Sequence, residues 1–476
     1  MRSRAPRYAT IALAGLTLAS TSLLARPPLR AQQAPTSPNV VLIVVDDMRW
    51  DESGMPTALN ERFPKQYLPT IRNDIAADGF YASNAFVVNS LCCPSRASIL
   101  TGNYSHTTGV WNNQSQLGRG GFEALKPKEG STLATWFDDG GYRTALVGKY
   151  VNGYNATTHR PKGWDRWVAF IASTVGHYNY KLTIDGVSRS YGSTADEYST
   201  DVLADHASDF IRSTPAETPL FLYFTPYAPH SPFKPAPRHE GMFASYVPAM
   251  PPNLAEADVS DKPGWVRSLR RAGSAWAATK RTQMEMLMSV DDAIAQMQVA
   301  LGETGRLDNT IFVLISDNGL SGGSHRWTAK KSAWDEALRV PFIAKGPGIT
   351  PGTTSEQIIL NVDIADTLSD LTGVPVPATE GESVASLLAS GTEPVHTDFV
   401  FERLVDGSNP PSYCGVRSLT HKYVRYSTGE EELYDLVADP WEMQSLHADP
   451  RHKALKAELY ARTVQLCNPP PPGYGF

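Results

Sequence analysis

The sequence has few cysteines, no excess of positive charge and no internal repeat. Its 476 residues hold four cysteines, which excludes a small scaffold held together by many disulfides. Beyond the N-terminal segment no apolar run is long enough to cross a bilayer. No internal repeat and no long low-complexity tract is found, which argues against a repeat architecture. These absences favour a globular protein with one large or two unequal domains.

Basic residues are outnumbered by acidic ones. Lys and Arg number 43 against 49 Asp and Glu, a formal net charge of −6. Residues 1–31 contain five Arg and no acid, so their removal leaves 38 basic against 49 acidic residues, a charge of −11. A protein this acidic is not expected to bind nucleic acid non-specifically. If it handles an anion, it must gather positive charge locally.

Residues 1–31 have the composition of a secretory signal peptide. Three Arg precede the apolar stretch YATIALAGLTLASTSLLA, and small residues follow near Ala25 and Ala31. An uncleaved membrane anchor is the alternative, but the apolar run is short and diluted by Ser and Thr. We therefore expect an exported protein, periplasmic or secreted.

Four short apolar runs predict buried strands, and each ends in polar residues. They are NVVLIVVDD (39–47), YRTALVGKY (142–150), PLFLYFTPYAPH (219–230) and NTIFVLISDN (309–318). Runs without alternation are typical of a parallel sheet covered on both faces, and helical stretches fall between them. Residues 38–385 are thus predicted to form a doubly wound α/β domain. Ligands of such sheets bind at the carboxyl ends of the strands, where all four runs carry their polar groups.

The segment 390–470 is predicted to form a smaller α+β subdomain. HTDFVFERL, CGVRSLTHKYVRYST and EELYDLV resemble antiparallel strands, and a helix is predicted at PRHKALKAELYARTVQLC. In an exported protein Cys414 and Cys467 are able to pair, which would join this helix to its sheet.

Two acidic pairs at strand ends indicate a site for a hard cation. Asp46 and Asp47 close one predicted strand, and Asp317 and Asn318 close another. Three carboxylates and an amide carbonyl suit Ca²⁺ or Mg²⁺ better than zinc. The alternative is that each pair caps the helix after its strand. Two such pairs, each after a buried strand, favour the metal.

The stretch CCPSRASILTG (92–102) is predicted to start a helix. Pro94 suits the first helical position and Gly102 the end. Cys92 then lies at or just before the helix N-terminus, where backbone N–H groups attract anions, and Arg96 adds a positive charge one turn on. A nucleophile in this setting indicates attack on an anionic substrate.

Three stretches resemble the signatures of the sulfatase family. CCPSRASILTG matches its Cys-x-Pro-Ser-Arg motif, GYRTALVGKYV (141–151) a second signature, and ELYDLVADPWE (432–442) the family's C-terminal phrase. The resemblance implies an alkaline-phosphatase-like mixed sheet between helices and a sulfuric ester hydrolase activity. It also implies that a formylglycine-generating enzyme oxidises Cys92 to Cα-formylglycine, with Cys93 as a spectator in the variable position. The formylglycine hydrate would then attack sulfur and be regenerated by release of sulfate.

The resemblance assigns roles to the other polar residues. Asp46, Asp47, Asp317 and Asn318, with the modified Cys92, would hold the divalent metal, Ca²⁺ or Mg²⁺. Arg96 and Lys149 would hold the formylglycine hydrate. His230 in YAPHSPF and Lys330 in TAKKSAWDEALRVPF would bind sulfate and protonate the leaving group, whereas Lys331 falls outside the register. Asn152 and His325 are further candidates for binding the substrate.

One position departs from the family pattern. Val151 stands two residues after Lys149, where many sulfatases have a histidine. His177 and His325 are candidates to replace that group; alternatively, Asn152 marks a subgroup of the family. The phrases LCCPSRASILTG and GKYVNGY resemble the branch of N-acetylglucosamine-6-sulfatases and heparan 6-O-endosulfatases. That favours a sulfated sugar over a simple aryl sulfate. Two alternatives stay open: a phosphonate or phosphodiester hydrolase on the same scaffold, and a sulfated-glycan binder without catalysis. The oligomeric state is not predicted.

Overall fold

The four strands expected from the apolar runs lie side by side at the centre of one sheet. The computed structural model describes residues 37–56, 62–114, 119–155, 158–271 and 275–476, so the expected signal peptide at 1–31 lies outside the described residues. β8 (Thr310–Ser316), β1 (Asn39–Val45), β7 (Leu220–Thr225) and β3 (Arg143–Gly148) are neighbours and parallel to one another. Every residue of β1, β7 and β8 is buried, which explains why these runs show no alternation.

Six more strands complete a ten-stranded mixed sheet in the order β10-β2-β9-β8-β1-β7-β3-β4-β5-β6. β9 is antiparallel to both β8 and β2, and β5 is antiparallel to β4 and β6. The added strands are β2 (Phe80–Phe86), β4 (Arg166–Phe170), β5 (Lys181–Ile184), β6 (Val187–Ser190), β9 (Arg339–Lys345) and β10 (Thr353–Leu360).

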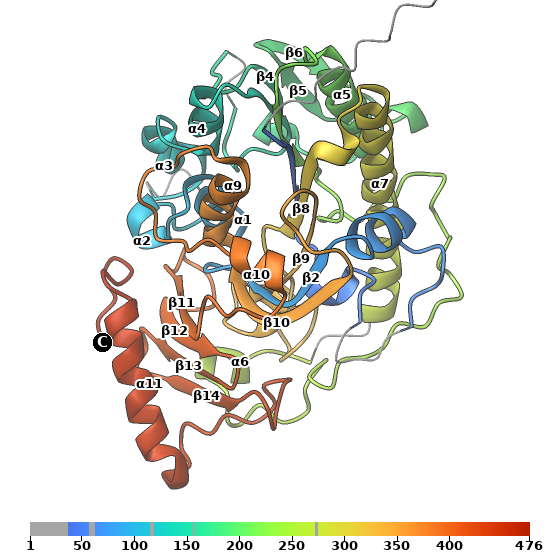
Figure 1. The fold of residues 1–476 in the computed structure, drawn as a ribbon. Coiled ribbons are helices and arrows are strands. Elements are labelled where there is room, and N and C mark those ends of the chain that lie inside the picture. The colour runs from blue at the N-terminus through green and yellow to red at the C-terminus, as the bar shows by residue number, and fades with distance from the viewer. Residues whose placement is uncertain (1–36, 57–61, 115–118, 156–157, 272–274) are drawn as a thin grey trace, which may run out of the picture. The chain divides into compact units, whose positions relative to one another are not determined.

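Helices cover both faces of this sheet (Figure 1). Alternate residues of β1 enter two separate cores: Val41 and Ile43 pack with α5 and α7, while Val40 and Leu42 belong to the core of α1, α4 and α9. This two-faced burial confirms the expected α/β class. The helices are α1 (Cys92–Thr101), α2 (Ser105–Thr108), α3 (Gly121–Leu125), α4 (Leu133–Asp139), α5 (Ser199–Ser213), α6 (Gly264–Arg267), α7 (Trp276–Glu303), α8 (Asp335–Leu338), α9 (Ile364–Thr372) and α10 (Ala385–Ser390), with a π-helix at Thr70–Ala76.

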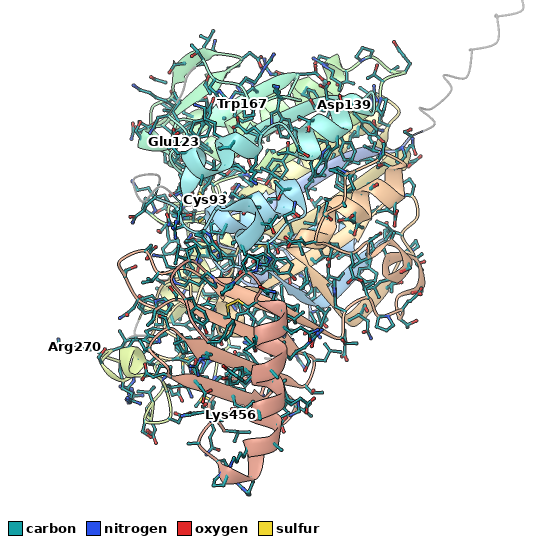
Figure 2. The ribbon with its side chains drawn as sticks, turned by 90° about the vertical axis from the view of Figure 1, so that its left-hand side faces the viewer. Cys93, Glu123, Asp139, Trp167, Arg270 and Lys456 are labelled. Atoms are coloured by element: carbon teal, nitrogen blue, oxygen red, sulfur yellow. A yellow bond between two sulfur atoms is a disulfide. The ribbon has the colours of Figure 1, made fainter. Side chains whose placement is uncertain are left out.

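A four-stranded antiparallel sheet follows in the C-terminal part of the chain. Its strands, in spatial order, are β11 (Asp398–Arg403), β12 (Tyr413–Ser418), β13 (His421–Tyr426) and β14 (Glu431–Asp435). α11 (Lys453–Leu466) lies along this sheet (Figure 2). A disulfide joins Cys414 of β12 to Cys467 at the end of α11. The two sheets belong to one compact unit.

The C-terminal sheet holds the segment that precedes β9. Arg417 and Lys422 donate to the carboxylate of Asp335 at 2.8 and 2.5 Å, at the start of α8. The Tyr413 hydroxyl donates to the backbone carbonyl of Lys331 at 3.0 Å. The small sheet therefore fixes the loop that carries Lys330. Among the described residues, no helix has both the length and the apolar character needed to cross a membrane.

Candidate active site

Two neighbouring strand ends bring the expected acidic pairs together. β1 and β8 are parallel and in register up to Val45 and Ser316, so the residues that follow them meet at one edge of the sheet. The Asp47 N–H donates to Asp317 Oδ1 at 3.1 Å, and Asn318 Nδ2 donates to Asp47 Oδ1 at 2.6 Å. Asp47 has φ of +66°, a left-handed backbone that turns the chain sharply after the strand.

The N-terminus of α1 places Cys92 against these carboxylates. The helix begins at Cys92, two residues before the expected start at Pro94, and ends as expected at Gly102, which has φ of +66°. The Cys92 sulfur lies 3.9 Å from Asp46 Oδ1 and is fully buried. The expected nucleophile therefore lies at a helix N-terminus and beside the acidic strand ends.

Two buried cations, Arg96 and Lys149, and the half-buried Lys330 surround the Cys92 sulfur and the carboxylates. Lys330 Nζ lies 2.8 Å from Cys92 Sγ and 2.6 Å from Asp47 Oδ1. Lys149 Nζ donates to Asp46 Oδ2 at 2.5 Å. Arg96 donates to Asp317 Oδ2 and to the Lys149 carbonyl, both at 2.8 Å, which joins α1 to the end of β3. The acidic chain thus gathers positive charge at one point, as binding an anion requires.

These charges shift one another's protonation. Burial alone would raise the pKa of Asp46, but Lys149, His230 and Arg96 lower it to about 2. Burial alone would lower the pKa of Lys330, but Asp47 and Cys92 raise it well above its ordinary value. Burial raises the pKa of the Cys92 thiol, although Lys149 and Lys330 oppose the rise. An unmodified Cys92 is therefore a poor source of thiolate at neutral pH.

His230 faces the same cluster through one of its two ring nitrogens. Its Nδ1 lies 2.5 Å from the carbonyl oxygen of Ser231, and because a carbonyl only accepts, Nδ1 must carry the hydrogen. Nε2 is then the nitrogen that faces the site, 3.5 Å from Asp47 Oδ2. The Tyr227 ring stacks on the imidazole with centroids 4.6 Å apart. The pattern YAPH gave no reason to single out Tyr227, although the residue precedes His230 by three positions.

The group fits a hard cation. Ligand atoms of Asp46, Asp47, Cys92 and His230 all lie within 4.8 Å of one another. Asn318 Oδ1 is buried and has no hydrogen-bond partner among the described residues, so it is a free carbonyl ligand beside them. Asp317 lies next to the group, but its two oxygens accept from Asp47 and Arg96. Carboxylate and amide oxygens form the donor set that Ca²⁺ and Mg²⁺ prefer.

A pocket of about 200 Å³ opens beside these residues. Its lining consists of Lys149, Tyr150, Val151, Asn152, Gly153, Phe170, Ala172, Val175, Tyr227 and His230. Aromatic and aliphatic side chains share its wall about equally with polar groups such as those of Lys149, Asn152 and His230.

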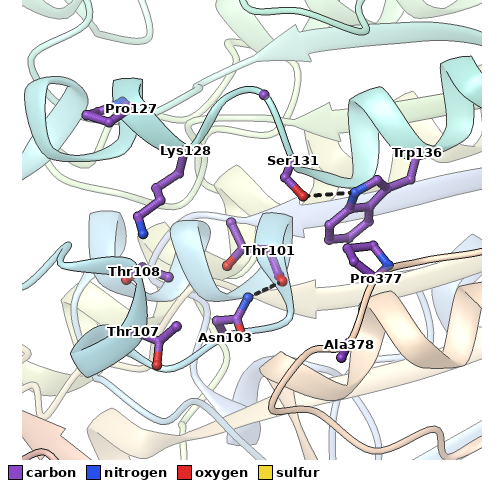
Figure 3. Close-up of a pocket in the computed structure, with 11 residues that line it drawn as sticks. Thr101, Asn103, Thr107, Thr108, Pro127, Lys128, Ser131, Trp136, Pro377 and Ala378 are labelled. Carbon is purple, nitrogen blue, oxygen red and sulfur yellow. Dashed lines mark hydrogen bonds between the residues drawn. The ribbon is translucent and has the colours of Figure 1, made fainter.

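A second pocket, of about 350 Å³, lies at the opposite end of α1 (Figure 3). Thr101, Lys128 and Trp136 are among the residues that line it. It contains none of the acidic or nucleophilic residues singled out above, so the pocket beside Cys92 is the candidate active site.

Two histidines predicted as alternatives, His325 and His177, make their contacts elsewhere. His325 is fully buried, its Nδ1 lies 2.6 Å from Glu256 Oε2, and its Nε2 lies 3.1 Å from Asn253 Nδ2, so these contacts do not join it to the site. His177 Nε2 lies 2.9 Å from the backbone carbonyl oxygen of His230, and its ring packs against Tyr227 with centroids 5.0 Å apart. Burial lowers the pKa of His177 to about 4.

The neighbours of the expected site residues also have defined places. Lys331 donates to Asp406 at 2.6 Å and to Ser408 at 3.2 Å, away from Cys92. Val151 is buried and forms an apolar part of the pocket wall. Cys93, expected to be a spectator, contacts Asn152 through its sulfur.

Comparison with known proteins identifies the family. The sulfatase family model matches residues 38–374, and the model for the C-terminal part of N-sulphoglucosamine sulphohydrolase matches residues 323–468. An arylsulfatase of Volvox carteri is 32% identical over 93% of this chain and 76% of its own length. The N-acetylglucosamine-6-sulfatase of Capra hircus is 31% identical over 94% of this chain and 88% of its own length.

A solved structure shares the fold. A solved structure of a protein in complex with its substrate D-glucosamine-2-N,6-O-disulfate superimposes with a TM-score of 0.77 at 24% identity, covering 91% of this chain and 98% of the other. That likeness concerns the fold. The sulfatase family model matches most of the length of this chain, so the chain belongs to the sulfatase family.

Proposed function

We propose that this protein hydrolyses the sulfate ester of a sulfated sugar of the N-acetylglucosamine 6-sulfate type. The observation that carries the proposal is the position of Cys92. The first residue of the sulfatase signature lies at a helix N-terminus, in contact with Lys330 and beside two strand-end carboxylates. The similarity to N-acetylglucosamine-6-sulfatase over 94% of the chain supports the choice of sugar.

Two groups absent from the polypeptide complete this site. We propose that Cys92 is oxidised to formylglycine, whose hydrate supplies a nucleophilic hydroxyl and a second hydroxyl whose deprotonation would release sulfate from the enzyme. Asp46, Asp47, Asp317 and Asn318 would hold a divalent cation, Ca²⁺ with Mg²⁺ as the alternative, together with the modified residue 92. Such an ion supplies Lewis-acid stabilisation of negatively charged oxygens.

The chain's own cations bind the anion and move protons. Lys149 and Arg96, anchored on Asp46 and Asp317, hold residue 92 in place at the helix N-terminus. Lys330 Nζ is placed to bind a sulfate oxygen beside the Cys92 position. His230 donates Nδ1–H to Ser231 and presents Nε2 to the site; as the imidazolium it carries a second proton on Nε2, which passes to the leaving oxygen.

The pocket wall would hold the sugar. Phe170, Val175 and Tyr227 offer apolar and aromatic surface, and Asn152 offers an amide. A pocket of about 200 Å³ suits one sugar ring better than a long segment of a polymer. The composition of residues 1–31 supports export, to the periplasm or the medium.

A sulfate-release screen tests this proposal. Matured enzyme is supplied with N-acetylglucosamine 6-sulfate, an aryl sulfate and a matched aryl phosphonate, and kcat/KM is compared. The proposal expects the sulfated sugar to be the best substrate and the phosphonate the poorest. A higher kcat/KM on the phosphonate would instead identify a phosphonate hydrolase. Binding of the sugar without release of sulfate by matured enzyme would identify a binding protein.

A further inference from the structure

Cys93 makes two hydrogen bonds to Asn152. The Cys93 sulfur accepts the backbone N–H of Asn152 at 3.1 Å and donates its S–H to Asn152 Oδ1 at 3.3 Å. The backbone N–H of Cys93 donates to Asn113 Oδ1 at 2.9 Å, which fixes the cysteine from the other side. The Cys93 side chain is fully buried. The residue in the variable position of the signature therefore ties the start of α1 to the loop after β3.

This contact determines which atom of the Asn152 amide remains for a ligand. A carboxamide has one acceptor oxygen and two donor hydrogens on nitrogen. The S–H turns the oxygen toward Cys93, so the Nδ2 amino group lies on the other side of the carboxamide, where among the described residues it makes no hydrogen bond. Asn152 lines the pocket with Lys149 and His230. The amino group is thus a hydrogen-bond donor at the wall of the pocket that contains the reacting groups.

The neighbouring residue cannot provide a polar group. Val151 lines the same pocket but offers only methyl groups. Asn152 comes next in the chain, and its own N–H is held by Cys93. The adjacent cysteine thus fixes the one polar side chain that the Tyr150–Gly153 part of the wall offers besides the Tyr150 hydroxyl, which donates to Glu129 at 3.1 Å.

We propose that Cys93 is a positioning residue of the substrate pocket, whose S–H holds the Asn152 carboxamide so that Nδ2 donates to an oxygen of the bound sulfated sugar. This inference rests on the proposed function for the identity of the ligand. It differs from the expectation that Cys93 is a spectator. Cys93 acts through Asn152 and does not touch the substrate.

A double-mutant cycle tests the coupling. Cys93→Ala, Cys93→Ser, Asn152→Ala and the double variant Cys93→Ala/Asn152→Ala are compared with wild type on N-acetylglucosamine 6-sulfate. Ser98→Ala is the matched control, because Ser98 is also buried on α1 and its hydroxyl has no partner among the described residues. The formylglycine fraction at position 92 is measured for each variant by mass spectrometry, and kcat/KM is corrected for it. The same cycle on a Cys92→Ala background gives Kd for the sugar without turnover.

The expected losses follow from the removal of a single hydrogen bond. Asn152→Ala lowers kcat/KM by about 3- to 10-fold, and Cys93→Ala by about 2- to 5-fold. The double variant is no worse than Asn152→Ala, because Cys93 acts through the amide. Cys93→Ser recovers part of the loss, since a hydroxyl is also a donor, and Ser98→Ala matches wild type. The Kd values follow the same order.

The results separate this inference from the proposed function. Wild-type kcat/KM and Kd in Cys93→Ala, or losses that multiply in the double variant, overturn the role of Cys93. Sulfate release by wild type with no coupling in the cycle removes this inference alone. Coupling in the Kd cycle with no sulfate release by matured wild type removes the proposed hydrolysis and leaves the positioning role in place.

Discussion

Replacement of Lys330 by methionine separates two adjacent lysines. Lys330 Nζ lies 2.8 Å from Cys92 Sγ and 2.6 Å from Asp47 Oδ1, whereas Lys331 Nζ points to Asp406. Methionine keeps much of the side-chain volume and removes the charge. Lys331→Met is the matched control in the same loop, and it leaves Asp406 paired with Arg403 at 2.9 Å.

The magnitude follows from the position of the charge. An ammonium about 4 Å from a sulfate oxygen contributes about 4 kcal/mol at an effective dielectric constant of about 20. If most of that interaction acts in the transition state, its loss lowers kcat/KM by about 10²- to 10³-fold. Lys331→Met is expected to stay within about twofold of wild type, because its contacts are peripheral.

The assay measures initial rates of sulfate release at equal formylglycine content. Circular dichroism melts confirm that both variants are folded, since loss of Lys330 leaves Asp47 without its closest cation. Near wild-type activity in Lys330→Met, or a larger loss in Lys331→Met, would show that Lys330 is not the lysine that binds the sulfate.

Three other predictions concern stability and the metal. Replacement of both Cys414 and Cys467 by serine should lower the free energy of unfolding by about 4 kcal/mol, because the bridge spans 53 residues, while kcat is retained; an unchanged denaturant midpoint would contradict this. Burial alone would lower the pKa of His106, but Glu380 and Glu402 raise it to about 10. A group whose pKa is raised in the folded state contributes its full stabilisation below its ordinary pKa near 6.5. This stabilisation is lost as pH rises toward 10. His106→Gln should therefore lower the denaturant midpoint by the equivalent of about 1–3 kcal/mol at pH 6 and by much less at pH 10, and a gap that grows with pH would refute this reasoning. Removal of divalent cations by a chelator should abolish sulfate release and added Ca²⁺ should restore it, whereas full activity after exhaustive chelation would exclude the proposed metal.

Local patterns predicted the parts of the fold that depend on short stretches of chain. β1, β3, β7 and β8 were expected because continuous apolar runs indicate strands buried on both faces, and all four lie together at the centre of the sheet. Gly102 ends α1 because it takes a left-handed backbone. Polar groups at strand ends indicated one shared site because parallel strands end at the same edge.

Features that depend on packing between distant segments were not predictable in this way. β9 runs antiparallel between β2 and β8, and its sequence does not specify that partner order. His325 belongs to a polar loop near Lys330, yet it is buried against Glu256. The contact of Cys93 with Asn152 depends on the approach of α1 to the loop after β3, which neither motif indicates alone.

Mass spectrometry of the peptide that contains Cys92 and Cys93 tests the central claim most directly. The measurement uses enzyme from its native host that has been shown to release sulfate. We expect formylglycine at position 92 and an intact thiol at position 93, with activity proportional to the converted fraction. An unmodified thiol at position 92 in fully active enzyme would contradict it.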